Sequence, residues 1–228
     1  MTPDSHGPAA STEATDSVAS AGAPGARAGA AAYGTAAYGT AAYGTAVYER
    51  TVDGFGTVRV VPLDPDRDAP LVHSWVSEER ARFWGMRDAS VEDVRDVYAH
   101  LDTLTTHHAF LVLRDGVPVA LFQTYDPEAD RVSECYEVRP GDIGVHLLLA
   151  PAAAPEPGFT GHVLGVLTAY CLSTHERIVV EPDAANEKAV ALMARSGFEV
   201  GPEVVLPEVL LPEVHLPAKR ARLAFLSR

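Results

Sequence analysis

The sequence contains few residues that could form a disulfide framework or bind a metal ion. Among its 228 residues there are two cysteines, Cys135 and Cys171, and both lie in apolar stretches. We therefore expect reduced thiols rather than a disulfide or a metal site, which is typical of a cytoplasmic protein. The histidines show no metal-ligand spacing with carboxylates or cysteines, so we expect no metal cofactor.

Positive charge is also scarce. The chain has 18 Lys and Arg against 31 Asp and Glu, a formal net charge of −13. Because no basic stripe is present to neutralise phosphates, the charge argues against nucleic acid or an anionic membrane as the main partner. No apolar run approaches the roughly 18 residues of a transmembrane helix, and no basic segment precedes an apolar one at the N-terminus. We therefore expect neither secretion nor membrane insertion.

The first 46 residues lack leucine, isoleucine and phenylalanine altogether. They consist mainly of Ala, Gly, Thr, Ser, Pro and Tyr, and AAYGT occurs three times in residues 31–45. Such a composition cannot bury enough apolar surface to offset the loss of chain entropy. We predict a disordered tail over residues 1–46 and a single domain over residues 47–228.

A second short repeat lies near the C-terminus. PEVVL, PEVLL and PEVHL follow one another from Pro202 to Leu216, and proline recurs every fifth residue. This spacing prevents a regular helix or a central strand and is too short for a solenoid unit. The repeat is either an edge used for docking or a local sequence expansion, and we favour the expansion. As an insertion over residues 202–217, it either loops out or disturbs the last edge of the sheet.

The remaining pattern predicts a mixed α/β (α+β) layer fold. Val117 follows an Asp-Gly pair that is typical of a tight hairpin, and Ser90 with Asp93 resembles a capping box. Antiparallel strands come first, and strands alternate with helices afterwards, which predicts a mixed sheet with helices on both faces. The predicted strands span 56–63, 109–113, 117–124, 134–138, 143–149 and 177–180, and the predicted helices span 91–104 and 163–172, with a further helix starting at Asn186 and ending at Gly197.

Three places could carry chemistry, but none is decisive by itself. His146 shares one face of its strand with Leu148, and an isolated strand histidine is more often structural than catalytic. Asp183 follows a strand, where functional side chains are common, but it is equally a helix-start residue. Gly158 and Gly161 precede an apolar helix whose free N–H groups suit a phosphate, although such connections are usually only turns.

Four segments together resemble the siderophore-type acyltransferases of the GNAT superfamily, which acylate hydroxylamines or lysine side chains. The resemblance spans nearly all of residues 50–228 and is far more specific than any single segment. It implies the GNAT fold, a mixed central sheet flanked by helices. The segments are HSWVSEERARFWGM at 73–86, YEVRPGDIGVHLLLAP at 136–151, RIVVEPDAANEKAVALMARSGFEV at 177–200 and LPAKRARLAFLSR at 216–228.

The resemblance also implies a set of site residues. His146 would act as general base, and Asp183 would orient the base or hold the substrate nitrogen. A nitrogen that attacks a thioester must lose a proton, and the ordinary histidine pKa of about 6.5 suits that step. The co-substrate would be an acyl-CoA, either acetyl-CoA or succinyl-CoA. The implied cofactor-binding residues are Gly158, Thr160, Gly161, His162 and Asn186, and the implied substrate-binding residues are His73, Trp75, Trp84 and Glu181.

The leading hypothesis is an enzyme that acylates an N-hydroxylated diamine or N6-hydroxylysine in siderophore biosynthesis. The alternatives are acylation of an unmodified amine, such as a lysine side chain or an aminoglycoside, and use of a carrier-protein thioester instead of CoA. A non-catalytic acyl-CoA-binding module is a further alternative, although the presence of both His146 and Asp183 favours an enzyme. The connection at 150–165 departs from ordinary GNAT enzymes because it contains no Arg or Lys.

Overall fold

The computed structural model describes residues 43–152, 154–210 and 215–228. The chain begins with two strands, alternates helices and strands in the middle, and ends with four strands. In chain order they are β1 (Tyr48–Val52), β2 (Gly56–Pro62), α1 (Pro65–Val76), η1 (Glu79–Trp84), α2 (Val91–Asp102), β3 (His107–Arg114), β4 (Val117–Tyr125), η2 (Pro127–Ala129), η3 (Arg131–Cys135), β5 (Asp142–Leu149), α3 (Phe159–Thr174), β6 (Arg177–Val180), α4 (Glu187–Arg195), β7 (Glu199–Leu206), β8 (Val209–Leu210), β9 (His215–Leu216) and β10 (Lys219–Ser227).

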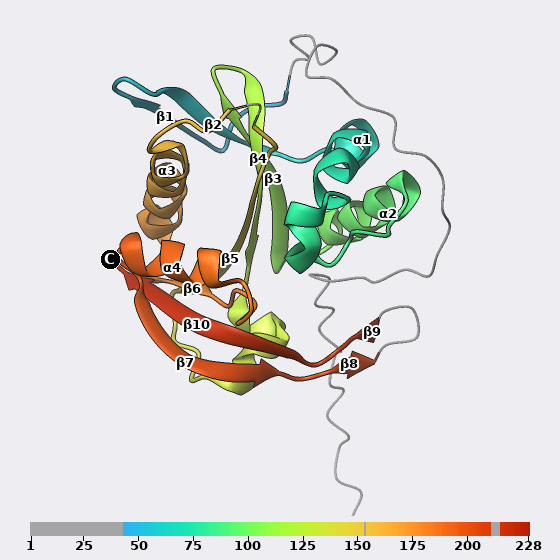
Figure 1. Cartoon of the computed structure of the whole chain (residues 1–228), viewed down its shortest axis with the longest axis vertical. Helices are drawn as coiled ribbons and strands as arrows, with labels where there is room; N and C mark the ends of the chain where they lie inside the picture. Colours follow the sequence, from blue (N-terminus) through green and yellow to red (C-terminus); the bar gives the residue numbers. More distant parts are fainter. Residues whose placement is uncertain (1–42, 153, 211–214) are drawn as a thin grey trace, which may run out of the picture.

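The central feature is a mixed sheet of eight strands in the order β1-β2-β3-β4-β5-β6-β10-β7. All neighbouring strands run antiparallel except β5 and β6, which are parallel. Helices α1 and α2 cover one face of the sheet, and α3 and α4 cover the other (Figure 1). Each face therefore buries its own hydrophobic core. The predicted mixed α/β layer fold is confirmed.

Local signals in the sequence account for several elements. Ser90 caps α2 through a complete capping box with Asp93, as predicted. Asp115 and Gly116 both have positive φ, 49° and 83°, and close the β3–β4 hairpin. Asn186 caps α4 by accepting a hydrogen bond from the backbone N–H of Ala189. These short-range interactions fix the start of α2, the β3–β4 hairpin and the start of α4.

Strand β1 and helix α1 were not among the predicted elements. The start of α1 does carry a helix signal, since the Asp64 side chain accepts from two backbone N–H groups and Pro65 occupies the first turn. However, Pro70 lies inside the helix, where proline removes a hydrogen bond and normally argues against helix. Burial of one face, including Leu71 and Trp75, outweighs this cost.

The strand predicted at 134–138 is wrong. Glu134 and Cys135 instead end the 3-10 helix η3, which starts where the Asp130 side chain accepts from the backbone N–H of Val132 at 2.8 Å, and residues 136–138 form no helix or strand. Val132, Cys135 and Tyr136 then pack against the outer strands β7 and β10. The apolar run therefore covers the sheet rather than joining it.

The first copy of the PEV repeat completes β7, the last strand of the sheet. Pro202 falls where the pairing of β7 with β10 shifts register, between the pairs of Val200 and Glu203. Proline is tolerated at such a bulge on an edge strand. Further along, β8 and β9 form a two-stranded ribbon, and β10 keeps its pairing with both β6 and β7. The first copy is therefore part of the edge strand, with a register shift at Pro202, and the described residues after it form a ribbon outside the eight-stranded sheet.

The predicted tail, residues 1–46, falls almost entirely outside the described residues. Only its last four residues are described, and of these Tyr43 and Ala46 pack against the core on the α1 and α2 face. Tyr43 also lies under the guanidinium of Arg67, 5.0 Å from its ring centre. None of the helices in the described ranges is long and apolar enough to cross a membrane.

A buried ion pair fixes the parallel part of the sheet. Arg177 at the start of β6 donates two hydrogen bonds, of 2.7 and 2.6 Å, to the carboxylate of Asp142 at the start of β5. The Asp142 side chain is 1% exposed. Since a buried charge that loses its partner is costly, this pair constrains where β5 and β6 begin.

Replacing Arg177 should therefore destabilise the domain. We expect Arg177→Met to lower the free energy of unfolding by about 3 kcal/mol, because Asp142 would remain buried without its partner. Arg95→Ala, which removes an exposed pair with Asp96, should change it by less than about 1 kcal/mol. Urea titration of the two variants beside the wild type measures both values, and equal effects would contradict the structural role of the pair.

Candidate active site

The site lies where strands β5 and β6 part. Their parallel pairing covers only Asp142–Gly144 of β5. Beyond that point β5 continues to Leu149 and is paired only with β4 on its other side. One edge of β5 is thus without a strand partner over several residues, and its backbone groups on that edge can meet an extended ligand.

His146 on β5 and Glu181 directly after β6 meet at this point. The Nε2 atom of His146 lies 2.5 Å from Oε1 of Glu181, and the hydroxyl of Tyr125 donates to the other carboxylate oxygen at 2.7 Å. Glu181 is 5% exposed, whereas the His146 side chain is 21% exposed. A buried carboxylate therefore holds an imidazole that a substrate can reach.

Gly144 makes this contact possible. Tyr125 lies opposite Gly144 in the β4–β5 pairing. A Cβ atom at residue 144 would lie 2.0 Å from the Tyr125 ring, well inside contact distance. The ring must therefore cross β5 over a residue without a side chain to reach Glu181.

The surroundings keep Glu181 ionised. Burial by itself would raise the pKa of this carboxyl, but the positive charge and hydrogen bond of His146 outweigh burial, and Lys219 and the Tyr125 hydroxyl add to them, so the pKa falls to about 2. Burial and the charge of Glu181 raise the pKa of Tyr125 well above its ordinary value. Near neutral pH Glu181 is an anion, and Tyr125 is a neutral donor.

Polar side chains continue on the other side of His146. Its Nδ1 atom lies 3.3 Å from Oε1 of Gln123 on β4, and the Gln123 amide donates to the hydroxyl of Tyr98 at 3.4 Å. Tyr98 is fully buried in α2 and also bonds with Trp84. The Trp84 ring stands edge-on to His146 at 6.2 Å. Of the predicted substrate-binding residues, the structure brings Trp84 and Glu181 to His146.

The predicted cofactor-binding residues at the start of α3 lie together. Gly158 precedes the helix with φ 78°, and no side chain caps the first turn, which contains no acidic residue. Thr160, Gly161 and His162 form that turn, and His162 stacks on Phe55 at 4.7 Å. This start of a 16-residue helix presents N–H groups and a positive dipole end, which suits an anionic group.

Asp183 and Asn186 lie further along the chain from Glu181. Asp183 forms a bridge with Ala221 on β10, and its Oδ1 atom accepts from the backbone N–H of Ala185 at 2.8 Å. Among the described residues it makes no hydrogen bond with His146. Asn186 caps α4, and the described interactions include no contact of its side chain with the start of α3. The carboxylate that contacts the histidine is Glu181, two residues before Asp183.

Two other predicted substrate-binding residues belong to α1. Trp75 is 4% exposed and packs in the core, which favours its structural interpretation. His73 is half-buried, and its Nε2 atom lies 3.1 Å from the backbone oxygen of Ala89. Neither ring contacts His146 among the described interactions.

Sequence reasoning missed Gln123, Tyr125 and Tyr98. Gln123 and Tyr125 stand on the same face of β4, because residues two apart point to the same side. A polar residue within the apolar run VALFQTY was a possible signal for Gln123. Tyr98 gave no such signal, since it occupies an ordinary core position of α2.

No group of three or more His, Cys, Asp or Glu side chains with metal-binding geometry occurs in the described ranges. Both cysteines are free thiols, Cys171 buried and Cys135 half-buried. Burial raises the pKa of Cys171 to about 12, so this thiol stays protonated near neutral pH.

A family model described as an acetyltransferase (GNAT) domain matches residues 64–206 of the chain. Among curated proteins, an N(6)-hydroxylysine O-acetyltransferase of Escherichia coli is 27% identical over 140 residues, which are 59% of this chain and 44% of that protein. The chain therefore matches less than half the length of this relative.

Solved structures agree on the fold. An uncharacterized protein from Bacillus halodurans has a TM-score of 0.65 at 21% identity, covering 79% of this chain and 89% of its own. Aminoglycoside acetyltransferase AAC(6')-Ib in complex with coenzyme A has a TM-score of 0.60 at 20% identity, covering 75% and 95%. Spermidine N-acetyltransferase from Vibrio cholerae, with CoA and spermine, has a TM-score of 0.56 at 14% identity, covering 75% and 95%.

Gly144→Ala should inactivate the site, because the added methyl group would displace the Tyr125 ring and break its hydrogen bond with Glu181. We expect turnover to fall at least about a hundredfold, comparable to the loss of an oriented base. Gly165→Ala is the matched control, since a Cβ atom there meets nothing within 4 Å. Turnover by Gly144→Ala close to that of Gly165→Ala would contradict this role of Gly144.

The low pKa of Glu181 predicts how stability depends on pH. Its pKa is about 2 in the folded protein against an ordinary value of 4.5, so its contribution is present above pH 4.5 and is lost as the pH falls towards 2. Glu181→Gln should be less stable than the wild type by about 3 kcal/mol at neutral pH, and the difference should shrink between pH 4.5 and 2. Urea titrations across this range would contradict the ion pair if the difference stayed constant.

Proposed function

This chain belongs to the GNAT acetyltransferase family, and we propose that it acylates an N-hydroxylated diamine or N6-hydroxylysine, forming a hydroxamate for siderophore biosynthesis in the cytoplasm. The observation that carries the proposal is the partly exposed His146, held by the buried Glu181 where β5 and β6 part. Residues 47–228 form the catalytic domain in this proposal.

His146 is the general base. With Nε2–H directed at Glu181, Nδ1 is the basic nitrogen, and once it has taken the proton of the attacking nitrogen its N–H can donate to Oε1 of Gln123. As the nitrogen attacks, the new C–N bond forms, the thioester C–S bond breaks, and the imidazole becomes an imidazolium beside a carboxylate. The ionised Glu181 stabilises that positive charge and keeps the ring oriented.

Two features of the chain suit the acyl-CoA, the start of α3 and the open edge of β5. The uncapped start of α3 is suited to the pyrophosphate, since it offers N–H groups without acidic side chains. The edge of β5 beyond Gly144 offers backbone groups to an amide-containing arm. The neighbours crystallised with coenzyme A support an acyl-CoA co-substrate, acetyl-CoA or succinyl-CoA.

The charge balance favours a hydroxylated acceptor. A hydroxylamine is neutral near pH 7, so it can approach His146 without first losing an ammonium proton. Both oxygens of Glu181 already accept hydrogen bonds, from His146 and Tyr125, which leaves this carboxylate poorly placed to hold an ammonium group. Asp183, whose Oδ1 atom caps a turn, holds the acceptor nitrogen in this proposal. The E. coli relative, an N(6)-hydroxylysine O-acetyltransferase, agrees with the choice of acceptor.

An unmodified amine is the second candidate. The observation in its favour is that fold neighbours are an aminoglycoside acetyltransferase and a spermidine N-acetyltransferase. The net charge of −13 would also attract a cationic amine.

Thiol release from acetyl-CoA and succinyl-CoA tests the proposal, with N-hydroxycadaverine, N6-hydroxylysine, cadaverine, lysine, spermidine and kanamycin as acceptors. We expect kcat/KM at least about a hundredfold higher for the hydroxylated acceptors than for their parents. His146→Ala should lose turnover by about a hundredfold or more, whereas His108→Ala, an exposed histidine on β3, should keep it.

The other outcomes are equally distinct. Turnover confined to the unmodified amines would establish the second candidate. No turnover on any acceptor, together with tight acyl-CoA binding, would indicate a non-catalytic module. Full activity in His146→Ala would show that another group removes the proton.

A further inference from the structure

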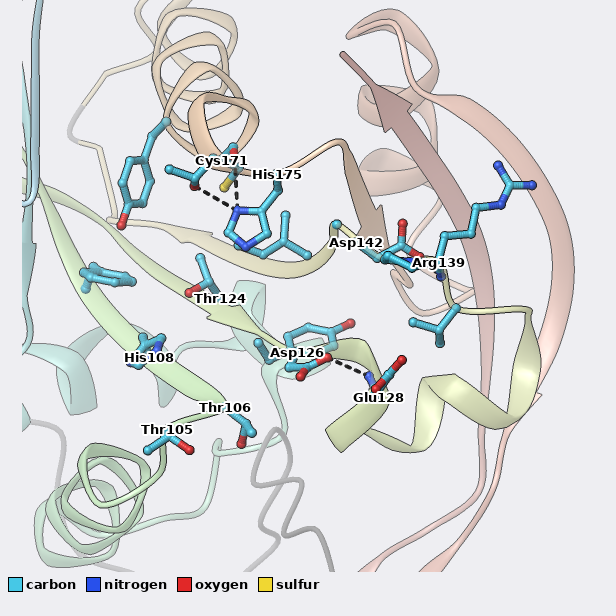
Figure 2. Close-up of a pocket in the computed structure, with 18 residues that line it drawn as sticks. Thr105, Thr106, His108, Thr124, Asp126, Glu128, Arg139, Asp142, Cys171 and His175 are labelled. Atoms are coloured by element: carbon cyan, nitrogen blue, oxygen red, sulfur yellow. Dashed lines mark hydrogen bonds between the residues drawn. The ribbon is translucent and has the colours of Figure 1, made fainter.

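A large hollow lies on the face of the sheet opposite to His146. Its volume is about 470 Å³, within the range of sites that hold small organic molecules (Figure 2). Phe110, Ile143 and Cys171 form its apolar floor and belong to the core under α3. Leu148, which shares its face of β5 with His146, belongs to the core under α1 and α2 instead. The hollow is therefore distinct from the proposed catalytic site.

A buried hydroxyl without a partner lines this hollow. Thr124 on β4 is 5% exposed, and its side chain makes no hydrogen bond with any residue in the described ranges. A buried hydroxyl that forms no hydrogen bond costs free energy, so each such group calls for an explanation. Here the hydroxyl is placed to bind a polar group that enters the hollow.

A ring nitrogen of His175 is available at one end of the hollow. Its Nδ1 atom lies 3.3 Å from the backbone oxygen of Cys171 and 3.0 Å from the hydroxyl of Thr174. A carbonyl oxygen can only accept, so Nδ1 carries a proton in this contact, and Nε2 of the neutral ring is an acceptor. Nε2 has no hydrogen-bond partner in the described part of the chain, and in Figure 2 it is turned toward Thr124.

The other end of the hollow is acidic. Asp126 and Glu128, directly after β4, line it, and neither carboxylate forms an ion pair with the residues that the structure describes. One oxygen of Asp126 accepts from the backbone N–H of Glu128 at 3.0 Å, which leaves its second oxygen available. Asp142 nearby is already paired with Arg177, and the side chain of Arg139 points away from the hollow (Figure 2). This end therefore favours a positively charged group.

We propose that this hollow binds an organic diamine in its ammonium form. One ammonium group donates to Asp126 and Glu128, and the other donates to the Thr124 hydroxyl and to Nε2 of His175. The carbon chain between them covers the apolar floor. These four side chains can all accept hydrogen bonds, so the ligand must donate, and an anion would be repelled by the two carboxylates.

This site goes beyond the acyl transfer proposed above and does not depend on it. None of the four side chains that hold the diamine has a part in the proposed catalysis. However, Thr124 stands between Gln123 and Tyr125 on β4, so the diamine would lie against the strand that supports His146 and Glu181. Cadaverine is a suitable probe, since it has two ammonium groups joined by a five-carbon chain.

Isothermal titration calorimetry of the full-length protein with cadaverine tests the inference. We expect the Kd to rise at least about tenfold in Thr124→Val and in the double variant Asp126→Asn/Glu128→Gln, because each removes acceptors for a charged donor. The double variant changes only exposed side chains, so it should fold as the wild type does. Asp88→Asn is the matched control, since it removes an exposed carboxylate that does not line the hollow.

Two further comparisons define the ligand and the place where it binds. Pentanoate, which has a chain of the same length but a negative charge, should not bind. His146→Ala should bind cadaverine in the hollow with wild-type affinity, because His146 lies on the other face of the sheet. Loss of binding in His146→Ala, with unchanged affinity in the double variant, would show that the amine occupies the acceptor site and would overturn the proposal. Absence of binding to the wild type would overturn it as well.

NMR locates the diamine directly. In ¹⁵N-histidine-labelled protein, cadaverine should shift the ring signals of His175 in the wild type but not in the double variant. The ring of His73, which does not line the hollow, serves as the internal control. Unchanged His175 signals at saturating cadaverine would contradict the assignment.

The two proposals fail separately. A protein that is inactive on every acceptor but binds cadaverine in this hollow would refute only the proposed function. A protein that is active on hydroxylamines, and whose affinity for cadaverine is the same in the wild type and the double variant, would refute only this inference.

Discussion

The contact between Glu181 and His146 imposes the strictest requirement on this fold. A buried carboxylate is stable only when hydrogen bonds and positive charge surround it. Here His146 and Tyr125 each donate a hydrogen bond to one of the two carboxylate oxygens. Tyr125 lies on β4, His146 on β5 and Glu181 directly after β6, so the contact depends on how these three strands are paired. Gly144 provides the gap for the Tyr125 ring, and the ion pair of Asp142 with Arg177 fixes β5 against β6 just before they part.

The divergence of β5 from β6 links this ion pair to the chemistry. One strand edge is left open beside His146, and the chain then leads from the end of β5 to the uncapped start of α3. In the proposed function these features receive the arm and the phosphates of one acyl-CoA, while the carboxylate fixes the base. At the start of α3 the first turn has no acidic side chain, so its backbone N–H groups and the helix dipole favour the phosphates.

Much of the fold could be predicted because its signals are local. The capping box at Ser90, the Asp-Gly turn before β4 and the alternation around His146 all depend on neighbours in the chain. Helix α1 could not be predicted because Pro70 lies inside it. The apolar run at 134–138 resembles a strand in sequence, because a segment that covers a sheet buries the same kinds of residue as a strand does. The pairing of His146 with Glu181 depends on the register of β4, β5 and β6. Glu181 and Asp183 lie on either side of Pro182 in the sequence, and no local pattern shows which of the two carboxylates contacts the histidine.

The most direct test of this account is the steady-state turnover of Glu181→Gln with saturating acyl-CoA and a hydroxylated acceptor, beside Asp183→Asn. If the buried carboxylate orients the base, kcat of Glu181→Gln falls at least about a hundredfold while KM for acyl-CoA stays near the wild-type value. Asp183→Asn should raise KM for the acceptor more than it lowers kcat. A Glu181→Gln enzyme with kcat within about twofold of the wild type would contradict the central role of this contact.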